Sequence, residues 1–148
     1  MKHMSPSKQS LTQMAESLIK GVCNRLKVLI VDDSRALQNR LAEMLRSVSG
    51  LNLIGQAHSV AEARDTITKL QPDVVVLDLQ LGDGNGIELL RETKRNYPFI
   101  RFIVFTNQCE LQYRRRCAEL GADYFLCKST DARSLIATTK DLATVLGH

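Results

Sequence analysis

The stretch Val74-Val75-Val76-Leu77-Asp78 lies between Pro72 and a glycine-rich run, residues 82–86 (GDGNG). Four consecutive apolar residues between turn-forming residues predict a short strand that is buried on both faces, as in a parallel sheet. The strand ends in the carboxylate of Asp78, which has no packing role at the tip of a central strand and does not directly cap a helix. Asp78 is therefore the first candidate functional residue.

Four more strands are expected around this one, each followed by a stretch with helical spacing of its apolar residues. They cover residues 28–31, 51–57, 100–105 and 124–127. Strands that alternate with five helices predict an α/β fold in which a doubly wound parallel sheet is covered on both faces. Right-handed crossovers leave only a few strand orders, of which we favour the flavodoxin-like order 2-1-3-4-5. The fourth helix is expected at 108–120 and the last from about 131.

The length and composition fit one domain. The chain has 148 residues, of which 44% are hydrophobic, enough for one core. We assign residues 26–148 to this domain and residues 1–25 to an N-terminal extension. The extension begins with a stretch, residues 1–4, that resembles a cloning-vector remnant, and continues as an expected amphipathic helix. The chain lacks a signal peptide and an apolar run of about 18 residues, so no membrane association is expected.

The charge pattern and the cysteine spacing further restrict the possible classes of function. The net charge is +4, but the lysines and arginines are scattered and not interleaved with aromatic residues, so we expect no direct binding of nucleic acid by this domain. The four cysteines, which lack CxxC or metal-ligand spacing, are expected to be reduced thiols in a cytoplasmic protein: Cys23, Cys109, Cys117 and Cys127. Cys109 and Cys117 are expected to face the core from one helix.

Polar residues gather at the carboxyl ends of the expected strands, where doubly wound sheets bind ligands. They are Asp32, Asp33, Asp78, Thr106 and Lys128. Taken singly, each has an ordinary explanation as a helix cap or a solvated side chain. Three crowded carboxylates, however, require a cation, and hard oxygen ligands suit Mg²⁺. With a lysine and a hydroxyl nearby, an aspartate can also act as a nucleophile toward a phosphoryl group.

Four segments resemble the receiver domain of bacterial two-component response regulators over residues 26–146. They are residues 29–34 (LIVDDS), 75–81 (VVLDLQL) with Gly86, 104–106 (VFT) and 121–128 (GADYFLCK). The resemblance implies that Asp78 accepts phosphate from the phosphohistidine of a histidine kinase or a phosphotransfer protein. It further implies that Mg²⁺ is held by Asp33, Asp78 and the Gln80 carbonyl, assisted by Asp32, and that Lys128 pairs with the phosphoryl group. Thr106 and Phe125 would form the switch.

The resemblance also implies what this protein contacts. It would be a signalling switch in a phosphorelay and not an enzyme beyond its own phosphorylation and dephosphorylation. It would act on a downstream protein or an output domain, with a possible homodimer through the face formed by residues 108–120, 124–127 and the last helix.

Three positions depart from the family pattern: Gly82, Asn107 and Ser129. A larger residue follows Thr106, and a proline is missing after Lys128.

Three alternatives remain open. The first is a protein-interaction module that binds its partner without phosphorylation, and the second is a receiver fragment of a longer DNA-binding regulator. The third is a Mg²⁺-dependent phosphatase with an aspartyl nucleophile. The usual DxD pair of such phosphatases is absent, because Asp32 and Asp33 are adjacent.

Overall fold

The computed structural model describes residues 25–146. The amphipathic helix expected near the N-terminus lies outside these residues. Along the chain, the described part forms β1 (Leu26–Val31), α2 (Arg35–Arg46), β2 (Leu51–Ala57), α3 (Val60–Leu70), β3 (Val74–Leu77), β4 (Gln80–Leu81), β5 (Gly84–Asn85), α4 (Gly86–Asn96), β6 (Arg101–Thr106), α5 (Leu111–Glu119), β7 (Tyr124–Cys127) and α6 (Ala132–Leu146).

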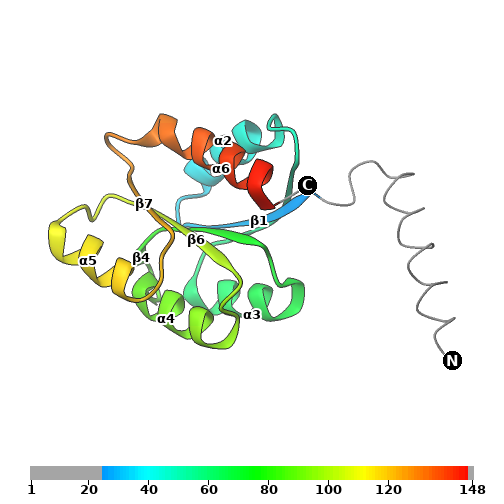
Figure 1. Ribbon diagram of the computed structural model, residues 1–148. Coiled ribbons are helices and arrows are strands. Elements are labelled where there is room, and N and C mark those ends of the chain that lie inside the picture. The colour runs from blue at the N-terminus through cyan, green and yellow to red at the C-terminus, as the bar shows by residue number, and fades with distance from the viewer. Residues whose placement is uncertain (1–24, 147–148) are drawn as a thin grey trace, which may run out of the picture.

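Five of these strands form one parallel sheet in the order β2-β1-β3-β6-β7. This confirms the predicted flavodoxin-like order, since β6 and β7 are the fourth and fifth strands of that sheet. Helices α2 and α6 cover one face of the sheet, and α3, α4 and α5 cover the other (Figure 1). The strand order reverses between β1 and β3, so the carboxyl ends of these two neighbours mark the switch point of the fold.

Strand β3 is the centre of the core, as its apolar sequence predicts. Val74 and Val76 pack into the cluster on the α2 and α6 side, whereas Val75 and Leu77 pack into the cluster on the opposite side. All four side chains are at most 2% exposed. Burial of an aliphatic side chain of this size stabilises the fold by about 1.5–3 kcal/mol, so this strand is firmly held. Its end therefore provides a rigid position for Asp78.

Two details differ from the sequence prediction. A two-stranded antiparallel hairpin, β4–β5, follows Asp78, and the sequence pattern did not predict it because each strand has only two residues. Helix α5 begins at Leu111 rather than 108. The chain after Thr106 first makes a turn in which the Gln108 N–H donates to Thr106 Oγ1 at 3.2 Å, and Glu110 has an extended backbone before the helix.

Candidate functional site

Three aspartates meet at the switch point of the sheet. Residues Val31 and Leu77 are paired across β1 and β3, and the Asp78 N–H donates to the Val31 carbonyl at 3.0 Å. The residues that follow these two strand ends are therefore neighbours. One carboxylate oxygen from each of Asp32, Asp33 and Asp78 lies within 4.8 Å of the others. The structure thus brings together the three acids that the sequence predicted to converge.

The three carboxylates differ in their surroundings. Asp32 is 2% exposed and Asp78 is 5% exposed, whereas Asp33 is exposed to solvent. Asp32 Oδ1 accepts a hydrogen bond of 2.9 Å from the Ser34 N–H, which fixes the buried carboxylate at the start of α2. Two buried acids and one exposed acid give a cluster that is open on one side.

Lys128 provides the positive charge of the cluster. Its Nζ donates to Asp32 Oδ2 at 2.7 Å and to Asp78 Oδ2 at 2.9 Å. Burial of the ammonium group lowers the pKa of Lys128, but the hydrogen bonds and charges of Asp32 and Asp78 outweigh that effect, and the net result is a raised pKa. Lys128 is therefore cationic at neutral pH, and the three carboxylates with one ammonium group carry a formal charge of −2.

Thr106 and the backbone of Gln80 hold the second oxygen of Asp78. The Thr106 hydroxyl donates to Asp78 Oδ1 at 2.8 Å, and the Gln80 N–H donates to the same oxygen at 3.1 Å. Thr106 is fully buried at the end of β6. Both oxygens of Asp78 are thus oriented by donors from three different segments. The assignment of the Gln80 carbonyl as a metal ligand stays a prediction.

Gly86 sets the path of the chain behind Asp78. Its N–H donates to the Leu79 carbonyl at 2.9 Å. A Cβ atom at this position would lie 2.6 Å from the Asp78 carbonyl oxygen and 3.0 Å from the Leu79 Cα. The glycine-rich run identified this turn in the sequence, but this close approach of two backbone segments follows only from the fold.

Asp83 ties the turn after Asp78 to helix α3. Its carboxylate accepts hydrogen bonds from the N–H groups of Val60 and Ala61, at 2.7 and 3.1 Å. These two bonds are the main reason why the pKa of Asp83 is lowered. Sequence reasoning missed this role because Asp83 caps a helix that begins 23 residues earlier in the chain, which no local pattern reveals.

Phe125, predicted as the switch aromatic, lies half-buried on β7. The guanidinium carbon of Arg114 lies 4.8 Å from the centre of its ring, a cation–π contact that links α5 to β7. No local pattern predicts this contact, because Arg114 stands within a run of three arginines that indicates a solvated face. The role of Phe125 in switching stays a prediction.

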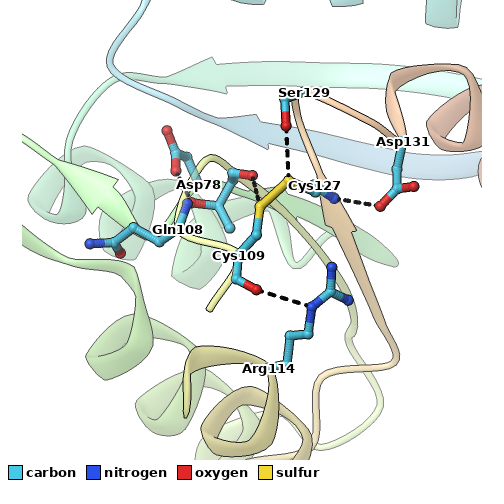
Figure 2. Close-up of a disulfide and its surroundings, with 8 residues drawn as sticks. Asp78, Gln108, Cys109, Arg114, Cys127, Ser129 and Asp131 are labelled. Atoms are coloured by element: carbon cyan, nitrogen blue, oxygen red, sulfur yellow. Dashed lines mark hydrogen bonds between the residues drawn. A yellow bond between two sulfur atoms is a disulfide. The ribbon is translucent and has the colours of Figure 1, made fainter. Parts of the chain in front are cut away.

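The prediction of reduced thiols is wrong for two of the cysteines. Cys109 and Cys127 form a disulfide (Figure 2). Cys109 does not lie on a helix with Cys117, because α5 begins after it. Cys117 is a fully buried free thiol, and burial raises its pKa to about 11. The sequence did not reveal the pairing because 18 residues separate the two cysteines, and only the β6–β7 register brings them together.

The donor set fits a divalent cation. It consists of three carboxylates with a net negative charge, buried on one side and open to solvent at Asp33. Mg²⁺ prefers oxygen ligands, is commonly held by one or two carboxylates, and keeps several water molecules. Asp33 and Asp78, with Asp32 nearby, are therefore suited to hold Mg²⁺, whereas soft metals that prefer thiolate or imidazole ligands do not match these donors.

The fold and this cluster define a flavodoxin-like α/β protein with an acidic site at the switch point of its sheet. Comparison with protein families shows that residues 28–140 match the response regulator receiver domain. The chain therefore belongs to the response regulator receiver domain family. This confirms the resemblance that the four sequence segments indicated.

Individual relatives agree with this assignment. The chain is 33% identical over 117 residues to the DNA-binding transcriptional activator DevR/DosR of Mycobacterium tuberculosis, covering 79% of this chain and 54% of that protein. It is 33% identical over 116 residues to a protein-glutamate methylesterase/protein-glutamine glutaminase of Treponema denticola, covering 77% of this chain and 31% of that protein. The chain thus spans between about a third and a half of these relatives' length.

Solved structures show the same fold. The non-phosphorylated HemR receiver domain from Leptospira biflexa superposes with a TM-score of 0.74 at 28% identity, covering 81% of this chain and 95% of that chain. The response regulator domain of Thermotoga maritima CheB gives a TM-score of 0.72 at 25% identity, covering 82% of this chain and 96% of that chain.

Among residues 25–146, no helix is both long and apolar enough to cross a membrane.

Proposed function

We propose that this protein is a phosphorylation-dependent signalling switch in which Asp78 accepts a phosphoryl group from a phosphohistidine. The donor would be a sensor histidine kinase or a phosphotransfer protein. The observation that carries the proposal is the pair of donors on Asp78, since Thr106 contacts one carboxylate oxygen and Lys128 the other. These are the donor types that phosphoryl transfer requires, because negative charge must be held on the phosphoryl oxygens.

In the transfer step, one carboxylate oxygen of Asp78 forms a bond to phosphorus while the bond from phosphorus to the imidazole nitrogen of the donor breaks. The imidazole leaves with the electron pair of that bond. Lys128 then shifts its hydrogen bond from Asp78 toward the transferred group, and the Thr106 hydroxyl donates a hydrogen bond to a phosphoryl oxygen. Bound Mg²⁺ supplies charge neutralisation for the phosphoryl oxygens, and Asp32, Asp33, Asp78 and the Gln80 carbonyl are the residues that we assign to hold it.

We infer that the output is a change in the surface formed by α5, β7 and α6. A short loop connects Thr106, at the end of β6, to α5. On α5, Arg114 contacts the ring of Phe125 on β7. A movement of Thr106 would therefore be transmitted through the loop to this surface. Leu111 and Tyr124 are exposed on it, at 58% and 38%. A downstream protein, an output domain or a second copy of the chain would bind there. We place the protein in the cytoplasm and assign no nucleic-acid or membrane contact to this domain.

The methylesterase relative indicates that receiver domains also occur in enzymes. In the chain described here, the acidic site itself carries the proposed chemistry, which is limited to its own phosphorylation and dephosphorylation. We therefore propose a switch rather than an enzyme that turns over an external substrate.

Incubation with acetyl phosphate and Mg²⁺, followed by intact-mass spectrometry, tests this function. The wild type is expected to gain one phosphoryl group, and removal of Mg²⁺ with a chelator is expected to abolish the gain. Asp33→Asn removes one carboxylate from the exposed side of the cluster, so it is expected to need at least about tenfold more Mg²⁺, as weakened metal sites commonly do.

Asp65→Asn is the matched control, because Asp65 is an exposed aspartate whose carboxylate pairs with Lys69 on α3. It is expected to require the same Mg²⁺ concentration as the wild type. No phosphoryl gain by the folded wild type at any Mg²⁺ concentration would contradict the proposal and favour an interaction module that works without phosphorylation.

A further inference from the structure

The Cys109–Cys127 disulfide, which Figure 2 shows, joins the two segments that carry Thr106 and Lys128. Cys109 follows Thr106 by three residues in the loop between β6 and α5, and Cys127 immediately precedes Lys128 at the end of β7. The Cα atoms of the two cysteines are 5.8 Å apart. One covalent bond therefore connects the two segments that supply the side-chain donors of the Asp78 carboxylate.

The bond also fixes the turn that orients Thr106. Cys109 Sγ lies 3.4 Å from the Thr106 carbonyl oxygen, which in turn accepts a hydrogen bond of 2.8 Å from the Lys128 N–H. The Cys109 carbonyl accepts a hydrogen bond of 3.2 Å from Arg114 Nε, and Arg114 contacts Phe125. The disulfide thus belongs to the same set of contacts as the Thr106 hydroxyl and the Phe125 ring.

The two cysteines differ in their exposure to solvent. Cys109 is half-buried, whereas Cys127 is 6% exposed, so Cys109 is the more accessible of the two to an external thiolate. Attack there releases Cys127 as the leaving thiolate. The exposed Ser129 places its Oγ 3.3 Å from Cys127 Sγ, where its hydroxyl can donate to the thiolate. Ser129 occupies the position at which the family pattern has proline, so this donor is a property of the present chain.

We propose that Cys109 and Cys127 form a thiol–disulfide modification site that sets how readily Asp78 holds a phosphoryl group. The reductant is a dithiol: its first thiolate attacks Cys109 to form a mixed disulfide, its second thiol displaces Cys109, and the dithiol leaves as a disulfide. The reverse exchange with a disulfide oxidant restores the bond and releases two thiols. The effect on phosphorylation rests on the proposed function, whereas the exchange itself does not.

The contacts determine the direction of the effect. In the disulfide form, the loop is tied close to Thr106, and its hydroxyl already points at Asp78. Reduction leaves only hydrogen bonds and packing to hold the loop, so more conformations become accessible and ordering Thr106 toward a phosphoryl group costs more conformational entropy. The disulfide form is therefore expected to bind a phosphoryl group more tightly than the dithiol form.

The first experiment follows the thiols alone. A chain with Cys23→Ser and Cys117→Ala keeps only the pair, and alkylation with intact-mass spectrometry counts its free thiols across a series of glutathione redox buffers. Interconversion between no free thiol and two free thiols is expected. Persistence of two free thiols in the most oxidising buffer, or of none in the native protein in the most reducing buffer, would overturn the modification site.

The second experiment measures the affinity of the same chain for Mg²⁺ with beryllofluoride, a phosphoryl mimic, in its disulfide and dithiol forms. The disulfide form is expected to bind at least about fivefold more tightly, the lower end of typical coupling between sites. Further replacement of Cys109 by serine is expected to give the weaker affinity in both buffers. Equal affinities of the two forms would overturn the coupling. Loss of binding in both forms would overturn the proposed function as well, while the thiol count still decides the modification site.

Discussion

Lys128→Met is expected to lower the rate of phosphoryl uptake by Asp78 about 10²–10³-fold, the cost of removing one preorganised donor from a transition state. The physical reason is that Lys128 Nζ contacts Asp32 and Asp78 within 3 Å. Methionine preserves much of the side-chain volume but removes the charge that would balance the phosphoryl oxygens. The rate is measured by intact-mass spectrometry at increasing times with acetyl phosphate and saturating Mg²⁺.

Lys94→Met is the matched control for this prediction. Lys94 is also a partly buried lysine in an ion pair: its side chain is 15% exposed beside Asp123, compared with 13% for Lys128. It does not contact the aspartate cluster. We expect the control to phosphorylate at the wild-type rate. A folded Lys128→Met variant with that same rate would contradict the role assigned to Lys128.

Gly86→Ala is expected to destabilise the protein by about 1–3 kcal/mol, the usual cost of inserting a methyl group into a packed region. The added Cβ would lie 2.6 Å from the Asp78 carbonyl oxygen, so the backbone that carries the carboxylate must move. We therefore expect a lower midpoint in urea unfolding, followed by circular dichroism, together with slower phosphoryl uptake.

Gly82→Ala serves as the control, because a Cβ at position 82 would meet nothing closer than Asp33 Oδ2 at 4.0 Å. Both glycines lie in the same turn region after Asp78, so the pair separates steric conflict from a general effect of replacing glycine there. Equal unfolding midpoints for the two variants would contradict the steric argument.

Much of the fold could be predicted because the core of this chain repeats a simple pattern. Buried apolar strands alternate with amphipathic helices, and β3 has four apolar residues in succession. A parallel sheet buried on both faces produces that pattern. The chain between β3 and α4 could not be predicted in the same way, because strands of two residues are too short to show a period.

The positions of the site residues followed from topology. Once the strand order is known, the residues after β1, β3, β6 and β7 must lie along one edge of the sheet. This is why Asp32, Asp78 and Lys128 meet as predicted. The roles of Asp83 and Arg114 depend on side chains that cross between elements, which the local sequence does not encode.

The Cys109–Cys127 disulfide likewise could not be predicted from the local sequence. Cysteines without a recognised spacing predict free thiols, and the sequence alone placed Cys109 on a helix. Because the chain makes a turn after Thr106, α5 begins only after Cys109. The pairing of Thr106 with Cys127 across β6 and β7 then brings the two sulfur atoms together. The disulfide therefore depends on the register between two strands, which the local sequence does not show.

We propose that Asp78 is the residue that carries the phosphoryl group. The most direct test is to phosphorylate the chain with acetyl phosphate and Mg²⁺, reduce it with sodium borohydride, which converts an aspartyl phosphate to homoserine, and sequence its peptides by mass spectrometry. Homoserine at position 78 alone, and nowhere in Asp78→Asn, is the predicted result. Homoserine at position 32 or 33 instead, or a phosphate on a hydroxyl side chain that survives acid, would contradict this assignment.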